Sequence, residues 1–189
     1  MIKTISKISK DLKSKFYFNY DTSQNVWFRA GGRTSIYCIV YDELELEFII
    51  KEIRNIPYIV IGAGSNLLIR DAGYQGIIFK LGKKFNTINL NQSSIEVGAG
   101  ILDVNFSKFA ALNGIKDFEF YSGIPGTIGG AIKMNAGCYG KETKDNLQNI
   151  KILNSEGKIN ILNKDQINLK YRSSNLLRDN IIISANYFY

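Results

Sequence analysis

Apolar residues near the start of the chain recur with a period that predicts an opening amphipathic helix. The intervals are three or four residues, at Ile5, Ile8, Leu12 and Phe16. This spacing places the apolar side chains on one helix face. The helix is expected to end near the aromatic stretch 16–20 and to pack on the main body.

Further along, short apolar runs separated by polar turns predict a series of strands and helices. Asp42 followed by Glu45 resembles the capping box that opens a helix, here expected to run to about residue 54. Further helices are expected over 102–112 and 131–135. The expected strands are 35–41, 58–61, 67–69, 77–81, 85–90, 94–97, 149–153, 158–162 and 181–189.

Two pairs of these strands read as hairpins. The turn between 85–90 and 94–97 contains Asn91 and Gln92, and Ser-Glu-Gly at 155–157 separates 149–153 from 158–162. Helices and strands therefore alternate irregularly, with hairpins among them. This order predicts the α+β class rather than a regular doubly wound sheet.

The composition narrows the chemistry. The 189 residues include no histidine, which removes a Ser-His or Cys-His nucleophile pair and leaves acid–base work to other side chains or a cofactor. Cys38 and Cys138 are far apart and belong to no cluster with metal-ligand spacing. We therefore expect neither a metal site nor a disulfide framework.

The charge and hydropathy of the chain indicate whether it binds nucleic acid or membranes. The net charge of +7 comes from scattered lysines, which indicate a solvated basic surface, whereas a nucleic-acid footprint clusters basic and aromatic residues. The longest uncharged run, 55–69, is too short and too broken to cross a bilayer. Lysines interrupt every apolar stretch at the N-terminus, so a secretory signal is not indicated. We expect a cytoplasmic protein without nucleic-acid or membrane partners.

A first glycine-rich loop follows the expected strand 58–61 and begins as a nucleotide-binding fingerprint does. Residues 62–64 read Gly-Ala-Gly, but Leu67 stands where a third glycine is needed and no helix is expected after it. The pattern disfavours a Rossmann site. Glycines still let backbone N–H groups converge on an anion, and Ser65 and Asn66 add donors. A plain tight turn is the alternative.

A second glycine-rich loop spans 123–131, with four glycines and a proline before a small-residue helix. Close approach of a ligand to the backbone explains this density, and so does tight helix packing. It is not a Walker loop, because no Lys-Ser or Lys-Thr follows the last glycine. A weaker element, Gly-Ala-Gly at 98–100, is either a strand end or a wall of a cofactor site.

Four segments occur in the order typical of one enzyme family. They are Phe-Arg-Ala-Gly-Gly at 28–32, Ile-Gly-Ala-Gly-Ser-Asn-Leu-Leu-Ile-Arg-Asp at 61–71, Ser-Gly-Ile-Pro-Gly-Thr-Ile-Gly-Gly-Ala at 122–131 continuing to Met-Asn-Ala-Gly-Cys-Tyr-Gly at 134–140, and Tyr-Arg-Ser-Ser at 171–174. The chain resembles the UDP-N-acetylenolpyruvoylglucosamine reductases, also called UDP-N-acetylmuramate dehydrogenases, of peptidoglycan synthesis.

The resemblance implies an FAD-binding domain of the vanillyl-alcohol-oxidase / p-cresol methylhydroxylase type, in which two α+β subdomains clasp FAD. Residues 1–24 would form an N-terminal helix and lead-in, and 25–189 the FAD-binding domain, with subdomains of about 25–82 and 83–189. In the family, NADPH reduces non-covalently bound FAD, and the flavin passes hydride to the enolpyruvyl carbon of the UDP-sugar substrate.

Carried over by position, the resemblance implies a role for each matching residue. Arg172 is expected to be catalytic by neutralising the substrate carboxylate, since a guanidinium stays charged and can grip a carboxylate through two hydrogen bonds. Tyr171 and Asn135 are expected to contact the substrate. The expected cofactor-binding residues are Gly62, Ala63, Gly64, Ser65, Asn66, Leu67, Gly98, Gly123, Ile124, Pro125, Gly126, Thr127, Gly129, Gly130 and Ala131.

One departure from the family pattern leaves three functions open. Family members continue into a substrate-binding domain that supplies a proton-donating serine, in Gly-Ser-x-Phe-Lys-Asn-Pro, and a glutamate near the C-terminus. Neither has a match here, so this domain is expected to be absent from the 189 residues or supplied separately. The chain is then the FAD portion of a reductase, an FAD-binding module without turnover, or another flavoenzyme of the superfamily. The oligomeric state is not indicated.

Overall fold

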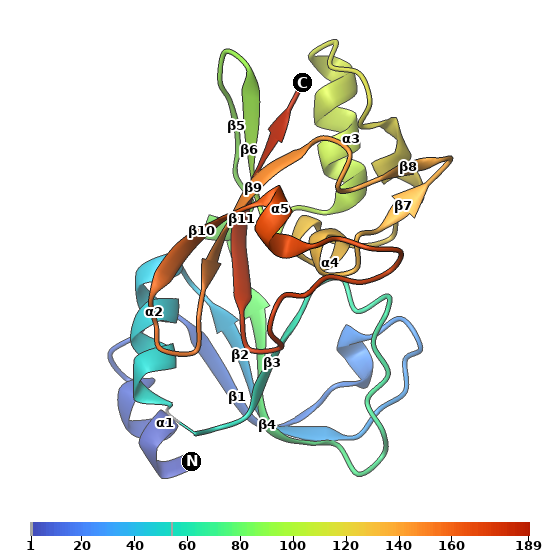
Figure 1. Ribbon diagram of the computed structural model, residues 1–189. Coiled ribbons are helices and arrows are strands. Elements are labelled where there is room, and N and C mark those ends of the chain that lie inside the picture. Colours follow the sequence, from blue (N-terminus) through green and yellow to red (C-terminus); the bar gives the residue numbers. More distant parts are fainter. Residues whose placement is uncertain (1, 54) are drawn as a thin grey trace.

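The computed structural model describes residues 2–53 and 55–189, which form two β-sheets with helices around them (Figure 1). One sheet has four strands in the order β1-β2-β4-β3, and the other has five in the order β10-β9-β11-β6-β5. Each sheet has its own half of the molecule, the first holding the N-terminus and the second the C-terminus (Figure 1). The mixture of helices and strands is the predicted α+β class.

The first half contains three strands that run parallel and one that does not. β2, β4 and β3 are parallel, and β1 is antiparallel to β2. Helices cover one face of this sheet, and the loops after β1 and β3 lie on the other (Figure 1). The elements are α1 (Ile2–Ile8), β1 (Lys15–Asp21), η1 (Ser23–Asn25), β2 (Arg33–Val40), α2 (Glu43–Glu52), β3 (Tyr58–Ile61) and β4 (Tyr74–Leu81).

Side chains of alternate residues along β2 point to the helix-covered face and form a core there. Ile36, Cys38 and Val40 are fully buried there, and the buried side chains of α2, Leu46, Ile49 and Ile50, belong to the same cluster. Full burial of each such aliphatic side chain contributes roughly 1.5–3 kcal/mol. Cys38 therefore lies in this core rather than on the loop-covered face.

The predicted opening helix is wrong in its length. α1 ends at Ile8, and residues 15–21 form β1, the edge strand of the first sheet. Aromatic contacts explain the difference, because the rings of Tyr20 and Tyr37 stack with centroids 4.6 Å apart across β1 and β2. Cross-strand pairs of this kind stabilise a sheet. The first sheet thus includes residues that the sequence interpretation assigned to the lead-in.

The predicted capping box at α2 is half confirmed. The Asp42 side chain accepts a hydrogen bond from the Glu45 backbone N–H at 3.0 Å. The Glu45 carboxylate does not return to Asp42. It accepts instead from the backbone N–H groups of Lys13 and Ser14, at 2.8 and 2.7 Å. Glu45 thereby fixes the segment between α1 and β1.

The second half is built on antiparallel pairs. β5 pairs with β6 and β9 with β10, which confirms both predicted hairpins; β11 lies between β6 and β9. The elements are η2 (Lys83–Phe85), β5 (Ile88–Leu90), β6 (Ser94–Gly98), α3 (Asp103–Leu112), η3 (Glu119–Gly123), α4 (Ile128–Lys133), β7 (Gly137–Cys138), β8 (Lys141–Glu142), β9 (Leu147–Leu153), β10 (Ile159–Asn163), α5 (Lys164–Ile167) and β11 (Ile181–Phe188).

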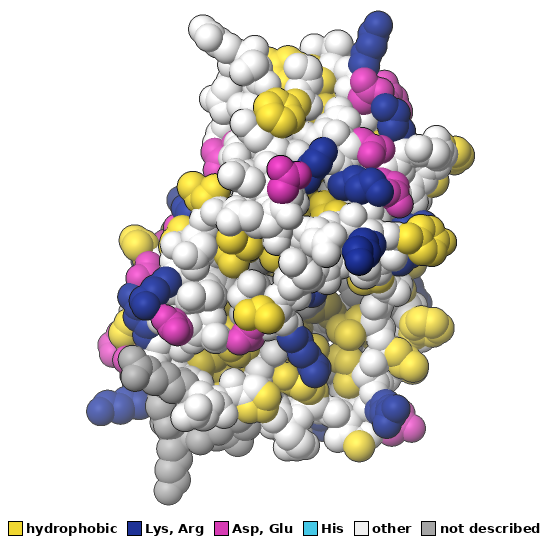
Figure 2. Space-filling view, viewed as in Figure 1, with side chains coloured by type: hydrophobic (Ala, Val, Ile, Leu, Met, Phe, Trp, Pro, Cys, Tyr) yellow, Lys and Arg dark blue, Asp and Glu magenta, His cyan; other side chains and the backbone are white. Residues whose placement is uncertain are grey.

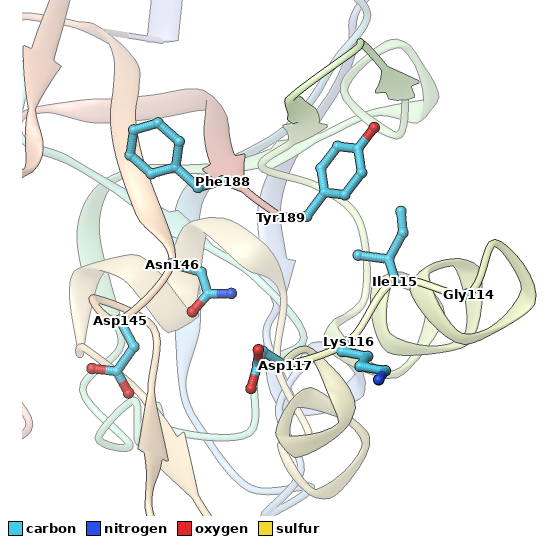
Figure 3. A pocket seen from close by; sticks show the side chains of 8 residues that line it. All are labelled: Gly114, Ile115, Lys116, Asp117, Asp145, Asn146, Phe188 and Tyr189. Atoms are coloured by element: carbon cyan, nitrogen blue, oxygen red, sulfur yellow. The ribbon is translucent and has the colours of Figure 1, made fainter.

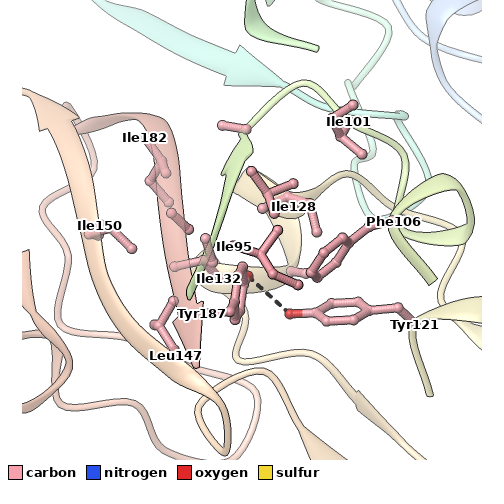
Figure 4. Packing of buried hydrophobic residues seen from close by; sticks show 14 of the residues in the cluster. Ile95, Ile101, Phe106, Tyr121, Ile128, Ile132, Leu147, Ile150, Ile182 and Tyr187 are labelled. Carbon is pink, nitrogen blue, oxygen red and sulfur yellow. Dashed lines mark hydrogen bonds between the residues drawn. The ribbon is translucent and has the colours of Figure 1, made fainter. Parts of the chain in front are cut away.

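Aromatic residues form the centre of the second core. Phe106 of α3 lies 5.5 Å from Tyr121 and 5.3 Å from Tyr187, measured between ring centroids. Both tyrosines are completely buried, and their hydroxyl groups are joined by a hydrogen bond of 3.1 Å (Figure 4). This bond satisfies polar groups that would otherwise be costly to bury.

Three local predictions differ from the structure. Residues 67–69 are not a strand, and the helix after the second glycine-rich loop begins at Ile128 rather than 131. β7, β8 and α5 were not predicted. The side chains of Asn163 and Gln166 form a capping box at α5. None of the helices in the described residues is long and apolar enough to span a bilayer.

Candidate functional site

The first glycine-rich loop, residues 62–67, leaves the C-terminal end of β3 without entering a helix. Gly64 has a φ of +74°, and a Cβ atom there would lie 2.1 Å from the carbonyl oxygen of Asn25. Only glycine fits both conditions. Within the described part of the chain, the N–H groups of residues 63–67 donate no hydrogen bond. The loop is therefore anchored through Gly64 while its donors stay available to an anion.

The second glycine-rich loop leads from η3 into α4 and packs against β6. The backbone N–H of Gly129 donates to the carbonyl oxygen of Ala99 at 3.0 Å, and a Cβ atom on Gly129 would be 3.1 Å from Ala99 Cβ. Gly129 thus permits close packing. The N–H groups of Gly126 and Thr127 donate no hydrogen bond to any described residue.

The two loops meet at Gly62 and Thr127. A Cβ atom on Gly62 would lie 2.4 Å from Thr127 Oγ1, and Thr127 is only 4% exposed. We call this contact the loop junction. It brings together the unpaired N–H groups of two segments some 60 residues apart in sequence. Figure 2 shows hydrophobic side chains on the surface where the two halves of the molecule adjoin.

A lysine reaches the loop junction from β4. Lys80 pairs in register with Ile61, the residue before Gly62, and its Nζ donates a hydrogen bond to the Gly62 carbonyl oxygen. Burial lowers the pKa of Lys80 from its ordinary value. Among the ion pairs of residues 2–53 and 55–189, none involves this lysine.

A carboxyl group lies beneath the second loop. Asp103 is the first residue of α3 and is 0% exposed, and neither carboxyl oxygen has a hydrogen-bond partner in the described structure. Burial raises the pKa of Asp103 to about 8. The group is therefore mostly protonated at neutral pH, since an unpaired charge is costly in an apolar surrounding.

Arg172 projects from the loop between α5 and β11. Its backbone has a φ of +53°, and its Nη2 donates to the Gly137 carbonyl oxygen at 3.1 Å. The guanidinium carbon lies 5.5 Å from the ring centre of Tyr171, which is 79% exposed. Both side chains are thus on the surface, where a substrate can reach them.

Asn135, expected to contact substrate, is instead completely buried. Its Nδ2 donates to the carbonyl oxygen of Lys170 at 3.1 Å and to Glu142 Oε2 at 3.2 Å. Its Oδ1 accepts from the Lys144 N–H at 3.0 Å. These bonds tie the β7–β8 turn to the residue before Tyr171, so the geometry favours positioning of the Arg172 loop over direct contact.

The remaining predicted residues fall into two groups. Gly98 is buried, and a Cβ atom there would lie 2.1 Å from the Phe85 carbonyl oxygen, which favours the strand-end interpretation. Gly123 is exposed and lies beside Cys138, because a Cβ atom on it would be 3.0 Å from Cys138 Sγ. Since Cys138 follows Gly137, β7 connects the second glycine-rich loop to Arg172.

A separate hollow lies at the far end of the second half, between the end of α3 and the end of β11 (Figure 3). Its lining includes Asp117, Asp145 and Tyr189 and none of the predicted site residues. A second hollow, lined by β1 residues and Arg33, also excludes them. Neither bears on the glycine-rich loops.

Two polar residues at the loops were missed by sequence reasoning, although each carried a signal. Lys80 is the one charged residue in the apolar strand segment 77–81, and Asp103 opens the helix 103–112 on its buried side. A charged side chain in an apolar pattern is informative because burying it is costly.

A family model described as an FAD binding domain matches residues 34–163. The chain therefore belongs to this family of FAD-binding domains, and the matched range includes both glycine-rich loops. The available N–H groups at the loop junction fit the diphosphate of FAD, which needs several converging donors.

More particularly, the chain is similar to the UDP-N-acetylenolpyruvoylglucosamine reductases of two bacteria. It is 39% identical to that of Pelagibacter ubique over 98% of this chain and 62% of the relative. It is 38% identical to that of Rickettsia typhi over 92% of this chain and 59% of the relative. The family resemblance is thereby confirmed. The chain spans about three fifths of the length of these relatives.

Solved structures confirm the fold class. The crystal structure of the UDP-N-acetylenolpyruvylglucosamine reductase from Thermus caldophilus matches with a TM-score of 0.80 and 28% identity, over 93% of this chain and 62% of that one. A VAO-type flavoprotein from Myceliophthora thermophila matches with a TM-score of 0.63 and 10% identity, over 82% of this chain and 32% of that one. The second likeness concerns the fold alone.

Proposed function

We propose that this chain is the FAD-binding part of an NADPH-dependent reductase of UDP-N-acetylenolpyruvoylglucosamine, in cytoplasmic peptidoglycan precursor synthesis. The observation that carries the proposal is the loop junction, where available N–H groups of two glycine-rich loops adjoin. The similarity to reductases that bear this name supports the choice of substrate.

The residues of the first loop, Gly62 to Leu67, would bind the FAD diphosphate through their backbone N–H groups. Each hydrogen bond from an amide to a charged phosphate contributes roughly 1.5–3 kcal/mol. Gly126 and Thr127 would add donors from the second loop, and Gly123 to Ala131 would border the flavin. When bound, FAD would accept hydride from NADPH and pass it to the substrate carbon.

Arg172 would neutralise the substrate carboxylate from the surface position that it occupies. A guanidinium with one N–H engaged still has donors free for a second partner. Tyr171, exposed beside it, would contact the same substrate. Asn135 would position this loop from within, through its bond to the Lys170 carbonyl oxygen. The UDP-sugar contacts beyond these residues would come from a further substrate-binding domain.

FAD would be bound without a covalent link. The sequence contains no histidine for attachment, and Cys38 is buried in the core on the helix-covered face of the first sheet. Cys138 lies beside Gly123 of the second loop but belongs to no attachment motif. Acid precipitation of the loaded protein should leave all flavin in the supernatant. Colour that stays with the precipitate would contradict this part of the proposal.

Absorbance spectroscopy tests the proposed function. The purified chain should show flavin absorbance after reconstitution with FAD, and a chain extended through a relative's substrate-binding domain should also bleach with NADPH and reoxidise with the UDP sugar. An FAD-binding module without turnover would bind flavin but show neither change in the extended chain. Another flavoenzyme of the superfamily would bleach with a different donor. No flavin binding would overturn the proposal.

A further inference from the structure

Lys80 is directed toward the loop-covered face of the first sheet. In β4, Lys80 lies two residues after Ile78, and side chains two apart along a strand share a face. Ile78 is buried in the cluster that contains Val26, Ile61 and Ile69, which come from the loop-covered face and from β3. Lys80 is also the register partner of Ile61 in β3 and Ile39 in β2. Its stem therefore belongs to the side of the sheet that carries the first glycine-rich loop.

The ammonium group of Lys80 is held at the loop junction by one contact. It donates to the Gly62 carbonyl oxygen, and Gly62 abuts Thr127 of the second loop. An ammonium group has three donors, so two remain after this bond. No hydrogen bond or ion pair to another described residue uses them.

A half-buried cation with unused donors is costly unless an anion accompanies it. The one recorded partner of Lys80 is a carbonyl oxygen, and burial alone, without a neighbouring carboxylate, accounts for its lowered pKa. Two other lysines provide a contrast within the chain. Lys51 and Lys151 are each paired with a glutamate, Glu47 and Glu43. An anion that approaches from outside the chain would supply the charged partner that Lys80 lacks among the described residues.

We propose that Lys80 is a diphosphate-binding residue, whose ammonium group supplies the positive charge for an anion held by the N–H groups of both glycine-rich loops. The inference rests on the proposed function, in which that anion is the diphosphate of FAD. Lys80 also fixes the orientation of the Gly62 carbonyl, so that the following N–H groups remain on the side of the incoming phosphate.

Four versions of the 189-residue chain test this inference by calorimetric titration with FAD. Lys80→Met keeps the unbranched apolar stem and removes the charge, and Lys80→Arg restores the charge. Lys83→Met is the matched control, because Lys83 is exposed and lies three residues after Lys80. This substitution removes the same net charge. We expect Lys80→Met to weaken FAD binding tenfold or more, Lys80→Arg to recover most of it, and Lys83→Met to stay within twofold.

Three smaller probes separate a phosphate contact from a structural effect. ADP and inorganic pyrophosphate contain the diphosphate without the flavin, and riboflavin contains the flavin without phosphate. Lys80→Met should weaken ADP and pyrophosphate binding by about the same factor as FAD and leave riboflavin binding unchanged. An equal loss for riboflavin, or an equal loss in Lys83→Met, would overturn the role of Lys80.

The proposed function and this inference fail in different ways. A wild-type chain that binds ADP and pyrophosphate but not FAD would contradict FAD binding and leave Lys80 measurable with the diphosphates. A Lys80→Met chain that binds FAD as tightly as wild type would overturn the inference alone. If Lys80→Met does not fold, Lys80→Gln decides: its FAD binding should be weaker and less salt-dependent than that of wild type, since loss of a phosphate contact lowers the salt dependence. Equal affinity and equal salt dependence would overturn the inference.

Discussion

The carboxyl group of Asp103 lies directly under Gly126, so that a Cβ atom at position 126 would be 2.5 Å from Asp103 Oδ2. The Asp103 N–H also donates to the Gly126 carbonyl oxygen at 3.1 Å. The start of α3 therefore supports the second glycine-rich loop through both a backbone bond and a side-chain contact. Changes on either side of this contact should alter the loop.

Stability should fall as pH rises because of Asp103. Below its ordinary pKa of 3.8 the carboxyl is protonated in the folded and unfolded chains, and it contributes no difference. Between that value and about 8, the unfolded chain loses the proton while the folded chain retains it. The free energy of unfolding therefore declines across this window, by up to a few kcal/mol, and this contribution is constant above it.

Asp103→Asn should remove this contribution, because the amide is neutral and close to the carboxyl in shape. Urea unfolding at a series of pH values, compared with the exposed Asp11→Asn, measures the effect. The free energy of unfolding of Asp103→Asn, relative to wild type, should increase from about pH 4 to about pH 8, because these values are close to the pKa of Asp103 in the unfolded and folded chains. A constant difference between the two chains would show that Asp103 does not titrate in this range.

Gly126 and Gly130 should respond in opposite ways to alanine. At Gly126 the added methyl group meets Asp103, and overpacking of this kind costs roughly 1–3 kcal/mol. At Gly130 the nearest atom to a Cβ is Thr127 Oγ1 at 3.6 Å, so alanine should leave the apo fold intact or stabilise α4 by about 0.5–1 kcal/mol. If FAD approaches the backbone at this point, Gly130→Ala should still weaken the binding of FAD.

Thermal unfolding of the apo chains and titration with FAD provide the two measurements. Unchanged FAD affinity in Gly130→Ala would mean that the cofactor does not approach this turn of α4. Unchanged stability in Gly126→Ala would mean that Asp103 moves aside at little cost.

The loop junction should behave as a coupled pair. Gly62→Ala introduces a methyl group 2.4 Å from Thr127 Oγ1, whereas Thr127→Ala removes that oxygen. We expect the double variant to be more stable than the sum of the two single effects, with a coupling of about 0.5–3 kcal/mol. Unfolding in urea of the four chains of this cycle measures it. Strictly additive effects would show that the two loops do not touch in solution.

Local patterns predicted much of the fold, whereas long-range contacts decided what the sequence interpretation missed. β3 and the two hairpins were recognisable because apolar runs are bounded by turn residues. β1 was not recognisable, because its apolar residues also fit helical spacing. The contact that favours a strand is the stacking of Tyr20 on Tyr37 of the next strand. Choosing between the two periods required the partner strand.

The site divides in the same way. Glycine density identified both loops, but the position of Asn135 inside the protein depends on bonds to Lys144 and to the more distant Lys170, which lie beyond the helix that precedes it. Lys80 was missed because its surroundings come from the loop after β3, not from β4. Sequence patterns therefore locate residues that a turn requires, and they do not show which polar groups a fold encloses.

FAD binding and substrate reduction should separate between this chain and a substrate-binding domain. Hydride transfer requires the substrate carbon to be held against the flavin, and such positioning lowers a barrier by roughly 7–11 kcal/mol. Arg172 offers one exposed cation for this task, and Asn135 holds its loop from beneath. We expect the 189 residues alone to bind FAD yet to oxidise NADPH negligibly in the presence of UDP-N-acetylenolpyruvoylglucosamine.

A chain extended through a relative's substrate-binding domain should be active, and Arg172→Ala in that chain should lose most of the sugar-dependent NADPH oxidation while keeping its FAD affinity. Removing one preorganised charge from a developing anion commonly costs a factor of roughly 100–1,000 in rate. Arg172→Lys should recover little, because an ammonium group cannot reproduce the bidentate grip on a carboxylate.

Arg178→Ala is the control, because Arg178 is an exposed arginine in the same loop, and this variant should retain activity. Robust turnover by the short chain would mean that the catalytic groups lie elsewhere in these residues, and a fully active Arg172→Ala would remove Arg172 from the mechanism.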